Sequence, residues 1–178
     1  NLRLIGVHAK SKAPHGARTD AGVMRIAIEN RRKQLAQCIW LRERVDDHLD
    51  QNDRLVVLGD FNDGPGLDEY EKLFGRSGVE IVLGVDDEAH LFDPHAAAMI
   101  GRVPGPVPAS ARFWLADQKR WMETLLDYVM VSPALVDEAD RWRIWHPVDD
   151  ANIAEVPELV SALLTASDHF PVSVELDI

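Results

Sequence analysis

The sequence is poor in cysteine and has no long apolar run. Cys38 is the only cysteine among the 178 residues, which excludes an internal disulfide. It falls within a helical pattern, and we expect it to be a small buried hydrophobic residue. No apolar run approaches the ~18 residues that a transmembrane helix needs, so the sequence predicts no transmembrane segment.

Positive charge is also scarce. The chain has 19 Lys and Arg residues against 30 Asp and Glu residues, which gives a net charge of −11. This balance argues against the broad basic surface that general polyanion binding requires. A phosphate substrate remains compatible with it, because a bound divalent metal reverses the local sign of charge and a site needs only a few cations.

Strand-like and helix-like segments alternate along the chain, which predicts an α/β fold. At 178 residues and 46% hydrophobic, the chain can bury a sizeable core, and we expect residues 1–178 to form one domain or the greater part of one. The predicted strands are 2–7, 55–58, 79–83, 125–131 and 172–176, and the predicted helices are 22–49 and 67–74. One face of the long helix is expected to be mostly solvated; it carries Arg31, Arg32, Lys33, Arg42, Glu43 and Arg44.

The middle of the chain is irregular. Three prolines in residues 102–108 exclude a helix or a central strand there, because proline removes backbone donors. Phe113, Trp114 and Trp121 follow, and we expect each to pack in the core rather than to stack on a base or a sugar. Residues 137–150 are ambiguous.

A first candidate motif follows the apolar run 55–58. There the sequence reads Gly-Asp-Phe-Asn-Asp, so that Asp60 and Asn62 stand two positions apart at the tip of a strand. Alternate residues of a strand lie on the same side, which places a carboxylate and an amide together. Alone, both residues are also typical turn formers.

A second motif, Ser-Asp-His-Phe-Pro, precedes the last predicted strand. Asp168 supplies a hard oxygen ligand beside the titratable imidazole of His169. These groups suit metal-assisted attack of water on a phosphate ester. Asp127 stands in an otherwise apolar strand, where a bare carboxylate is costly to bury unless a group such as a histidine partners it.

Together the motifs resemble the endonuclease/exonuclease/phosphatase superfamily, which has the DNase-I-like fold. Five segments occur in that family's order. They are the strand 1–10 with His8, the helix with Arg31 and Gln34, the Gly-Asp-Phe-Asn segment, the Leu-Asp-Tyr-Val-Met-Val-Ser segment 126–132, and Ser-Asp-His. The resemblance implies a four-layer αββα sandwich. The family's earlier strands, which carry an Asn and a metal-binding Glu, have no counterpart here, so we expect an incomplete sandwich made of the C-terminal part of the domain.

The resemblance, combined with the residue types, predicts the catalytic roles. Asp127 accepts a hydrogen bond from one ring nitrogen of His169, and the other nitrogen orients or deprotonates the attacking water. Asp168 and Asp60 are expected to bind Mg²⁺ or Mn²⁺, with Asp60 in the metal shell or protonating the leaving oxygen.

The remaining predicted site residues contact the substrate. Asn62 and His8 are expected to donate hydrogen bonds to the nonbridging phosphate oxygens, and Lys10 to contribute to substrate binding. Because the Glu ligand falls outside the chain, we expect residues 1–178 to be inactive or nearly so. Missing strands would also leave an apolar surface uncovered, through which the chain could self-associate.

Three functions remain open at this point. The leading prediction is a metal-dependent phosphodiesterase that acts on a phosphate-ester substrate, foremost nucleic acid. The second is a phosphatase or phosphodiesterase of the same family that acts on a lipid or a small molecule. The third is a noncatalytic interaction module, against which stands the joint presence of the carboxylates, the amide and the histidine.

Overall fold

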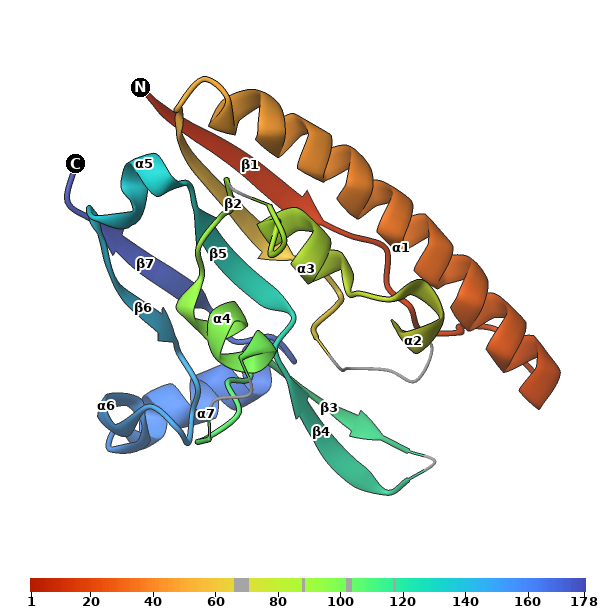
Figure 1. The fold of residues 1–178 in the computed structure, drawn as a ribbon. Coiled ribbons are helices and arrows are strands. Elements are labelled where there is room, and N and C mark those ends of the chain that lie inside the picture. The colour runs from red at the N-terminus through yellow and green to blue at the C-terminus, as the bar shows by residue number, and fades with distance from the viewer. Residues whose placement is uncertain (66–70, 88, 102–103, 117) are drawn as a thin grey trace.

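A computed structural model describes residues 1–65, 71–87, 89–101, 104–116 and 118–178 (Figure 1). The strands are β1 (Leu2–His8), β2 (Arg54–Asp60), β3 (Ala111–Leu115), β4 (Arg120–Thr124), β5 (Asp127–Val131), β6 (Ala139–Ile144) and β7 (Val172–Leu176). The helices are α1 (Asp20–Leu49), α2 (Glu71–Phe74), α3 (Gly78–Leu83), α4 (Pro94–Ile100), α5 (Pro133–Val136), α6 (Ala151–Ala154) and α7 (Pro157–Ala166).

A three-stranded sheet in the order β1-β2-β5 forms the centre of the molecule. β1 runs parallel to β2, and β5 runs antiparallel to it. Both faces of β2 are covered, because Leu55 and Val57 belong to one buried cluster and Val56 to another. A strand buried on both faces reads as a continuous apolar run, which is why this strand was evident from sequence.

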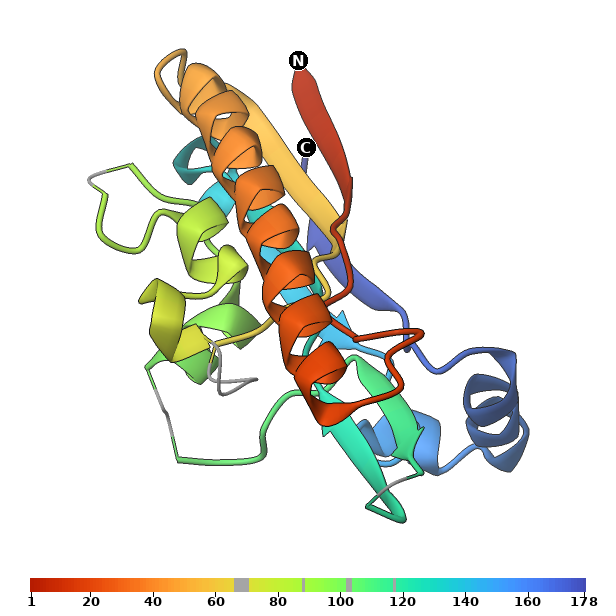
Figure 2. The same cartoon turned by 90° about the vertical axis from the view of Figure 1, so that its right-hand side faces the viewer.

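Helix α1 covers one face of this sheet, as the two orthogonal views show (Figures 1 and 2). Cys38, Leu41 and Val45 of α1 pack with α3 and with the sheet. Cys38 is 1% exposed, which confirms the prediction of a small buried residue, and burial raises the pKa of its thiol to about 12.

The opposite face of the sheet is only partly covered. The β6–β7 pair packs on it through Trp142, Val172 and Val174. Leu4 on β1, however, remains 65% exposed. The described residues therefore show a mixed α/β arrangement in which helices, a three-stranded sheet and a two-stranded sheet are layered. The complete four-layer sandwich and the self-association of the chain stay predictions.

Several local predictions were wrong, each because tertiary context decides the outcome. Residues 79–83 form helix α3 rather than a strand, since Ser77 and Glu80 make a reciprocal capping box at its start. Arg31 and Arg42, expected on a solvated face, are 1% and 9% exposed because they pair with Asp63 and Asp46.

The region before β5 forms the hairpin β3–β4, which the sequence analysis did not predict. Its Trp114 and Trp121 are 50% and 53% exposed, so the expectation of core packing was wrong for both. The ambiguous stretch 137–150 contains β6. Of the predicted helix 67–74, residues 67–70 lie outside the described residues and the remainder is α2.

Within the described residues, no helix combines the length and the apolar character that crossing a membrane requires.

Candidate active site

The ring of His169 is hydrogen-bonded to the first residue of β5. Nδ1 of His169 lies 2.8 Å from Oδ2 of Asp127, as expected from sequence. The same carboxylate oxygen accepts a hydrogen bond of 2.8 Å from the Ser110 hydroxyl. Ser110 is fully buried, and its own oxygen accepts the backbone N–H groups of Leu126 and Asp127. The carboxylate is therefore held in place from two sides.

This geometry defines the tautomer of His169. An ionised carboxylate can only accept, so Nδ1 is the donor and Nε2 is left to face the site. Burial by itself would lower the pKa of His169. The hydrogen bond and charge of Asp127, joined by the charges of Asp60 and Asp168, outweigh burial and raise this pKa above its ordinary value.

Asp60 stands at the end of β2, beside Asp127. Its Oδ1 accepts the backbone N–H of Asn62 at 2.7 Å, and its Oδ2 accepts the Asn62 amide at 2.6 Å. Burial raises the pKa of Asp60, and the neighbouring Asp127 charge adds to this effect, although Asn62 and the two histidines oppose it. Asp60 thus lies where its negative charge is poorly compensated.

The sheet register brings three of the predicted residues into one row. His8 pairs with Asp60 across β1 and β2, and Asp60 pairs with Asp127 across β2 and β5. Nε2 of His8 lies 3.6 Å from Oδ2 of Asp60, while the His8 side chain is 81% exposed. Residues paired in register share a face of the sheet. The row is therefore fixed by backbone pairing.

Two residues of this row, together with His169, form a group of side chains that fits a divalent metal. Asp60, Asp127 and His169 each offer one ligand atom, and these atoms lie within 4.8 Å of one another. Two carboxylates suit Mg²⁺ or Mn²⁺, which take carboxylate oxygen together with water and substrate phosphate. The raised pKa of Asp60 agrees with this fit, because a cation would supply positive charge beside the two carboxylates.

The other predicted site residues lie around this group. Within the part of the chain that the structure describes, Asp168 is not a member of the group; it lines a neighbouring pocket and influences His169 through its charge. Its role as a metal ligand stays a prediction. Lys10 donates its backbone N–H to Gln37 at 2.8 Å, which ties the segment after β1 to α1.

Asn62 has a different arrangement from the one predicted. Besides its bond to Asp60, its amide donates to the carbonyl of Ala9 at 3.2 Å. Both N–H groups of the Asn62 amide therefore donate within the protein, and one of them orients the Asp60 carboxylate. The backbone of Asn62 has φ 49°, a left-handed conformation that asparagine tolerates well.

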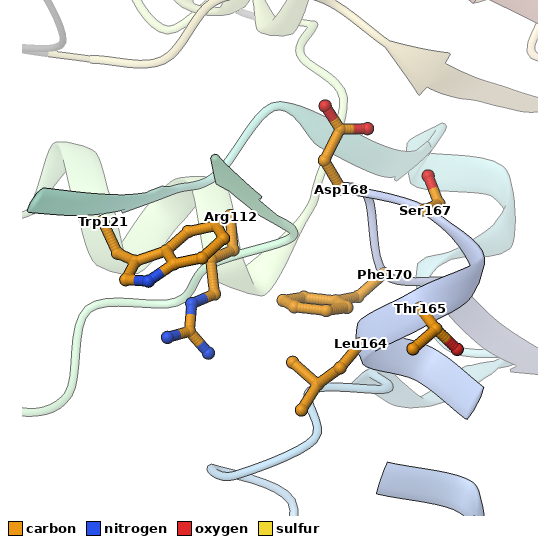
Figure 3. Close-up of a pocket in the computed structure, with 7 residues that line it drawn as sticks. All are labelled: Arg112, Trp121, Leu164, Thr165, Ser167, Asp168 and Phe170. Carbon is orange, nitrogen blue, oxygen red and sulfur yellow. The ribbon is translucent and has the colours of Figure 1, made fainter. Parts of the chain in front are cut away.

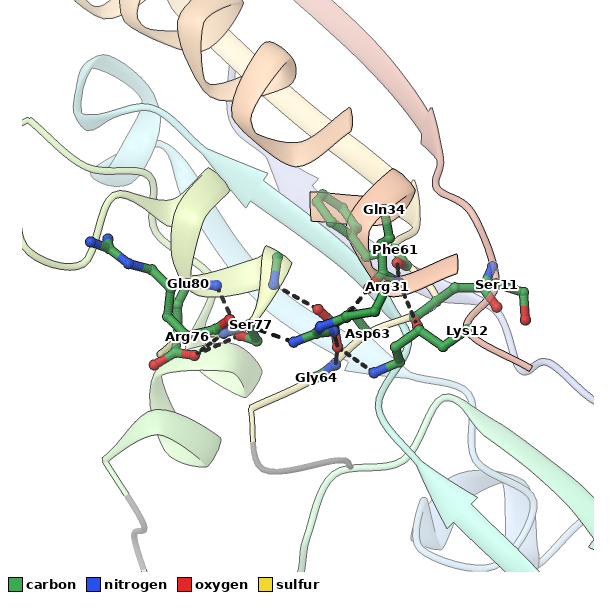
Figure 4. A network of polar contacts seen from close by, with 12 residues as sticks. Ser11, Lys12, Arg31, Gln34, Phe61, Asp63, Gly64, Arg76, Ser77 and Glu80 are labelled. Carbon is green, nitrogen blue, oxygen red and sulfur yellow. Dashed lines mark hydrogen bonds and ion pairs between the residues drawn. The ribbon is translucent and has the colours of Figure 1, made fainter. Parts of the chain in front are cut away.

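A buried polar network holds the loop that carries Asn62 (Figure 4). Asp63 is fully buried, and its Oδ1 lies 2.7 Å from Arg31 Nη1 and 2.6 Å from Lys12 Nζ. Its Oδ2 accepts the backbone N–H of Gly78 at 2.6 Å. Gln34 donates to the carbonyls of Phe61 and Asn62, at 3.1 and 2.9 Å. Side chains of helix α1 and of the segment before it thus hold the loop in place.

Sequence reasoning did not find all of these positions. Ser110 follows an irregular proline-rich segment, and no local pattern marks it. Asp63 is adjacent to the motif, and its role could have been inferred only from the charges of Arg31 and Lys12, which are distant in sequence.

Comparison with known proteins now defines the family. Residues 9–169 match the model of the endonuclease/exonuclease/phosphatase family. The chain belongs to this family. The match begins directly after β1 and ends at His169, so β1 and the final strand β7 lie outside it. No curated protein matches the chain.

Membership of the endonuclease/exonuclease/phosphatase family gives the cluster a chemical context. The family consists generally of hydrolases, and its members typically use divalent metals. The Asp60, Asp127 and His169 group is accordingly the part of this chain where such chemistry would be located.

Proposed function

We propose that this protein is a divalent-metal-dependent phosphodiesterase and that its substrate is nucleic acid. The observation that carries the proposal is the bond of 2.8 Å between Asp127 and His169, placed in register with Asp60. A carboxylate that orients a histidine beside a second carboxylate has the parts needed to activate water next to a metal-bound phosphate.

His169 is the proposed general base. Its Nε2 takes a proton from the attacking water, and Asp127 stabilises the resulting imidazolium through Nδ1. Ser110 positions Asp127 by donating to the same carboxylate. The shift of the His169 pKa to a higher value makes the ring a stronger base than an ordinary surface histidine.

The row of residues at the ends of β1, β2 and β5 handles the substrate phosphate. Asp60 and Asp127 would hold Mg²⁺ or Mn²⁺, which when bound supplies positive charge to the nonbridging phosphate oxygens. Asn62 keeps Asp60 in position. The exposed His8 donates to a nonbridging oxygen, and Lys10 adds a cation to the same side. Asp168 completes the set as a further oxygen ligand for the metal.

With His169 acting as the base, carboxylates alone would hold the divalent metal, which then depends on water and further ligands, so we expect weak metal binding and slow hydrolysis by residues 1–178. The test combines both properties. Mn²⁺ binding is measured by electron paramagnetic resonance, and hydrolysis of single-stranded DNA is measured with Mg²⁺ or Mn²⁺ and with EDTA.

His169→Ala should lower the hydrolysis rate about a hundredfold or more while Mn²⁺ binding is retained in part, because the general base is lost. Asp60→Asn should lower both the hydrolysis rate and the affinity for Mn²⁺. Glu158→Gln, which changes an exposed carboxylate on α7, is the control. A protein that neither binds Mn²⁺ nor hydrolyses any phosphodiester would contradict the proposal.

A further inference from the structure

A pocket of about 530 Å³ lies beside the candidate active site, between the hairpin β3–β4 and the end of α7 (Figure 3). Its apolar wall is formed by Trp121, Leu164 and Phe170, and Arg112 and Asp168 supply charge at its edge. Asp168 directly precedes the proposed general base, so the pocket and the candidate active site share the Ser-Asp-His segment.

Backbone contacts attach the pocket firmly to the site. The N–H of Arg112 donates to the carbonyl of Asp168 at 2.7 Å, and the N–H of Phe170 donates to the carbonyl of Ser110 at 2.6 Å. Ala111 and His169 also form a β-bridge. Strand β3 and the Ser-Asp-His segment therefore form one unit, and a ligand in the pocket has a fixed relation to His169.

The hairpin presents an exposed aromatic surface on the pocket side. Trp121 is 53% exposed, and the Arg112 guanidinium lies 4.7 Å from the centre of its ring. Trp114, its cross-strand partner and 50% exposed, meets it edge-on with ring centres 5.6 Å apart. Half-exposed tryptophans next to a cavity indicate binding, because aromatic residues with only a packing role are normally covered.

The hairpin segment 111–124 has three basic residues, Arg112, Lys119 and Arg120, against two acidic ones, Asp117 and Glu123, whereas the whole chain has a net charge of −11. Nε of Arg112 lies 3.5 Å from Glu123, and Nε of Arg120 donates to Gln118 at 2.8 Å. Aromatic rings next to cations form the combination that stacks on nucleic-acid bases and contacts the backbone phosphates.

We propose that this pocket binds the nucleobase next to the scissile phosphate, and that the substrate is single-stranded nucleic acid. The inference rests on the proposed function and specifies its substrate. A base offers both a ring face to Trp121 and hydrogen-bond acceptors to the Arg112 guanidinium, whose Nε lies 3.5 Å from Glu123, whereas a lipid chain offers neither. A duplex keeps its bases stacked, and the acidic chain lacks the broad basic surface that would track a duplex.

Binding is tested without catalysis. In EDTA, a 12-nucleotide oligothymidylate with a fluorescent label is titrated with protein, and its anisotropy gives Kd. The same titration uses a strand of equal length in which every nucleotide is replaced by its base-free sugar phosphate. Trp121→Ala should weaken binding of the oligothymidylate by about 5- to 100-fold and leave the base-free strand almost unchanged, since stacking on one base is lost.

Two further variants keep the result interpretable. Trp121→Phe preserves a ring and should stay within about threefold of the wild type, even if Trp121→Ala does not fold. Met24→Ala removes an apolar side chain that is 53% exposed on α1, outside the pocket, and should change the binding of neither strand. Competition with thymidine monophosphate shows whether the pocket binds a free nucleotide or a strand. If thymidine monophosphate displaces the labelled 12-mer as strongly as the unlabelled 12-mer does, the assignment to nucleic acid is overturned.

Hydrolysis by the same proteins separates the two proposals. If the wild type hydrolyses both strands and Trp121→Ala has the same KM as the wild type on each strand, the pocket assignment is overturned and the phosphodiesterase activity is retained. Base-dependent binding that requires Trp121, without hydrolysis of any phosphodiester, would support the pocket and overturn the proposed activity. Equal Kd values for the two strands in the wild type would overturn the pocket directly.

Discussion

Asp60 and Asp127 face each other in register on the neighbouring antiparallel strands β2 and β5. Two carboxylates opposed in this way repel each other, and the raised pKa of Asp60 shows part of that repulsion together with the effect of burial. The sheet tolerates the arrangement because Asn62, Ser110 and His169 donate hydrogen bonds to the pair. A strained pair of charges of this kind is a favourable position for a cation.

The first prediction concerns this pair. Millimolar Mn²⁺ should raise the melting temperature of the wild type by a few degrees, because a ligand that binds only the folded state stabilises it by about 2.7 kcal/mol at 100 times its Kd. Asp60→Asn should abolish this rise and leave the melting temperature in EDTA equal or higher. Calorimetry with and without Mn²⁺ measures both. Asp137→Asn, an exposed carboxylate elsewhere, should respond to Mn²⁺ as the wild type does.

The second prediction concerns the titration of His169. In the metal-free protein, its pKa should lie above the ordinary value of about 6.5, and Asp127→Asn should lower it because burial then acts without the hydrogen bond that opposes it. NMR of the ring protons in EDTA follows both titrations. A wild-type pKa at or below the ordinary value would contradict the hydrogen-bond geometry.

The same shift has a consequence for stability. A histidine whose pKa is raised on folding stabilises the folded state at pH values below its unfolded pKa, and this contribution is lost as pH rises through the folded pKa. The difference in unfolding free energy between the wild type and His169→Gln should therefore shrink across that interval in EDTA. Urea titrations at several pH values provide the measurement, and a difference that grows with pH would contradict the assigned direction.

The central strands and the site motifs could be predicted from sequence because their signals are local. β2 and β7 are short apolar runs bounded by polar motifs, and α1 shows a clear helical period. The cost of burying a lone carboxylate indicated that Asp127 has a partner, and the family resemblance together with the residue types identified that partner as His169.

Contacts between distant segments account for the failures. Nothing near Ser110 in sequence indicates that it anchors Asp127, because the two meet only when the hairpin forms. Arg31 resembles its charged neighbours on the helix, and only the buried Asp63 distinguishes it. Trp114 and Trp121 are of a residue type that is usually buried, and their exposure depends on where the hairpin lies relative to α7.

A third prediction concerns the glycine before Asp60. Gly59 has φ 136°, and a Cβ atom there would lie 2.0 Å from the carbonyl oxygen of Val7 on the neighbouring strand. Gly59→Ala must therefore separate β1 from β2, and we expect a loss of several kcal/mol and of the site geometry. Gly75→Ala is the matched control: its φ is 84° but a Cβ meets nothing within 4 Å, so only the backbone strain of about 1 kcal/mol should appear. Chemical denaturation of both variants measures the difference, and similar losses would show that the close approach to Val7 is unimportant.

The last prediction concerns the buried ion pair that holds the loop carrying Asn62. Arg31 and Asp63 are 1% and 0% exposed, with Nη1 and Oδ1 2.7 Å apart. Removing one partner of a buried pair and leaving the other charge uncompensated costs about 3–5 kcal/mol. Since Lys12 also lies 2.6 Å from Asp63, Arg31→Met should destabilise the protein by less than this, about 1–3 kcal/mol, in urea denaturation. Lys33→Met, which breaks the exposed pair with Glu29 one turn along on the same helix, should cost less than about 1 kcal/mol.

The double variant Arg31→Met with Asp63→Asn tests the cause. Because it removes both charges, it should recover part of the stability that Arg31→Met loses, even though Lys12 then loses its contact with the charged carboxylate. Thermal and urea denaturation of the three variants give the coupling free energy. Simple additivity of the two losses would mean that Asp63 acts through its bond to Gly78 and not through its charge, and that the loop carrying Asn62 is held by the backbone alone.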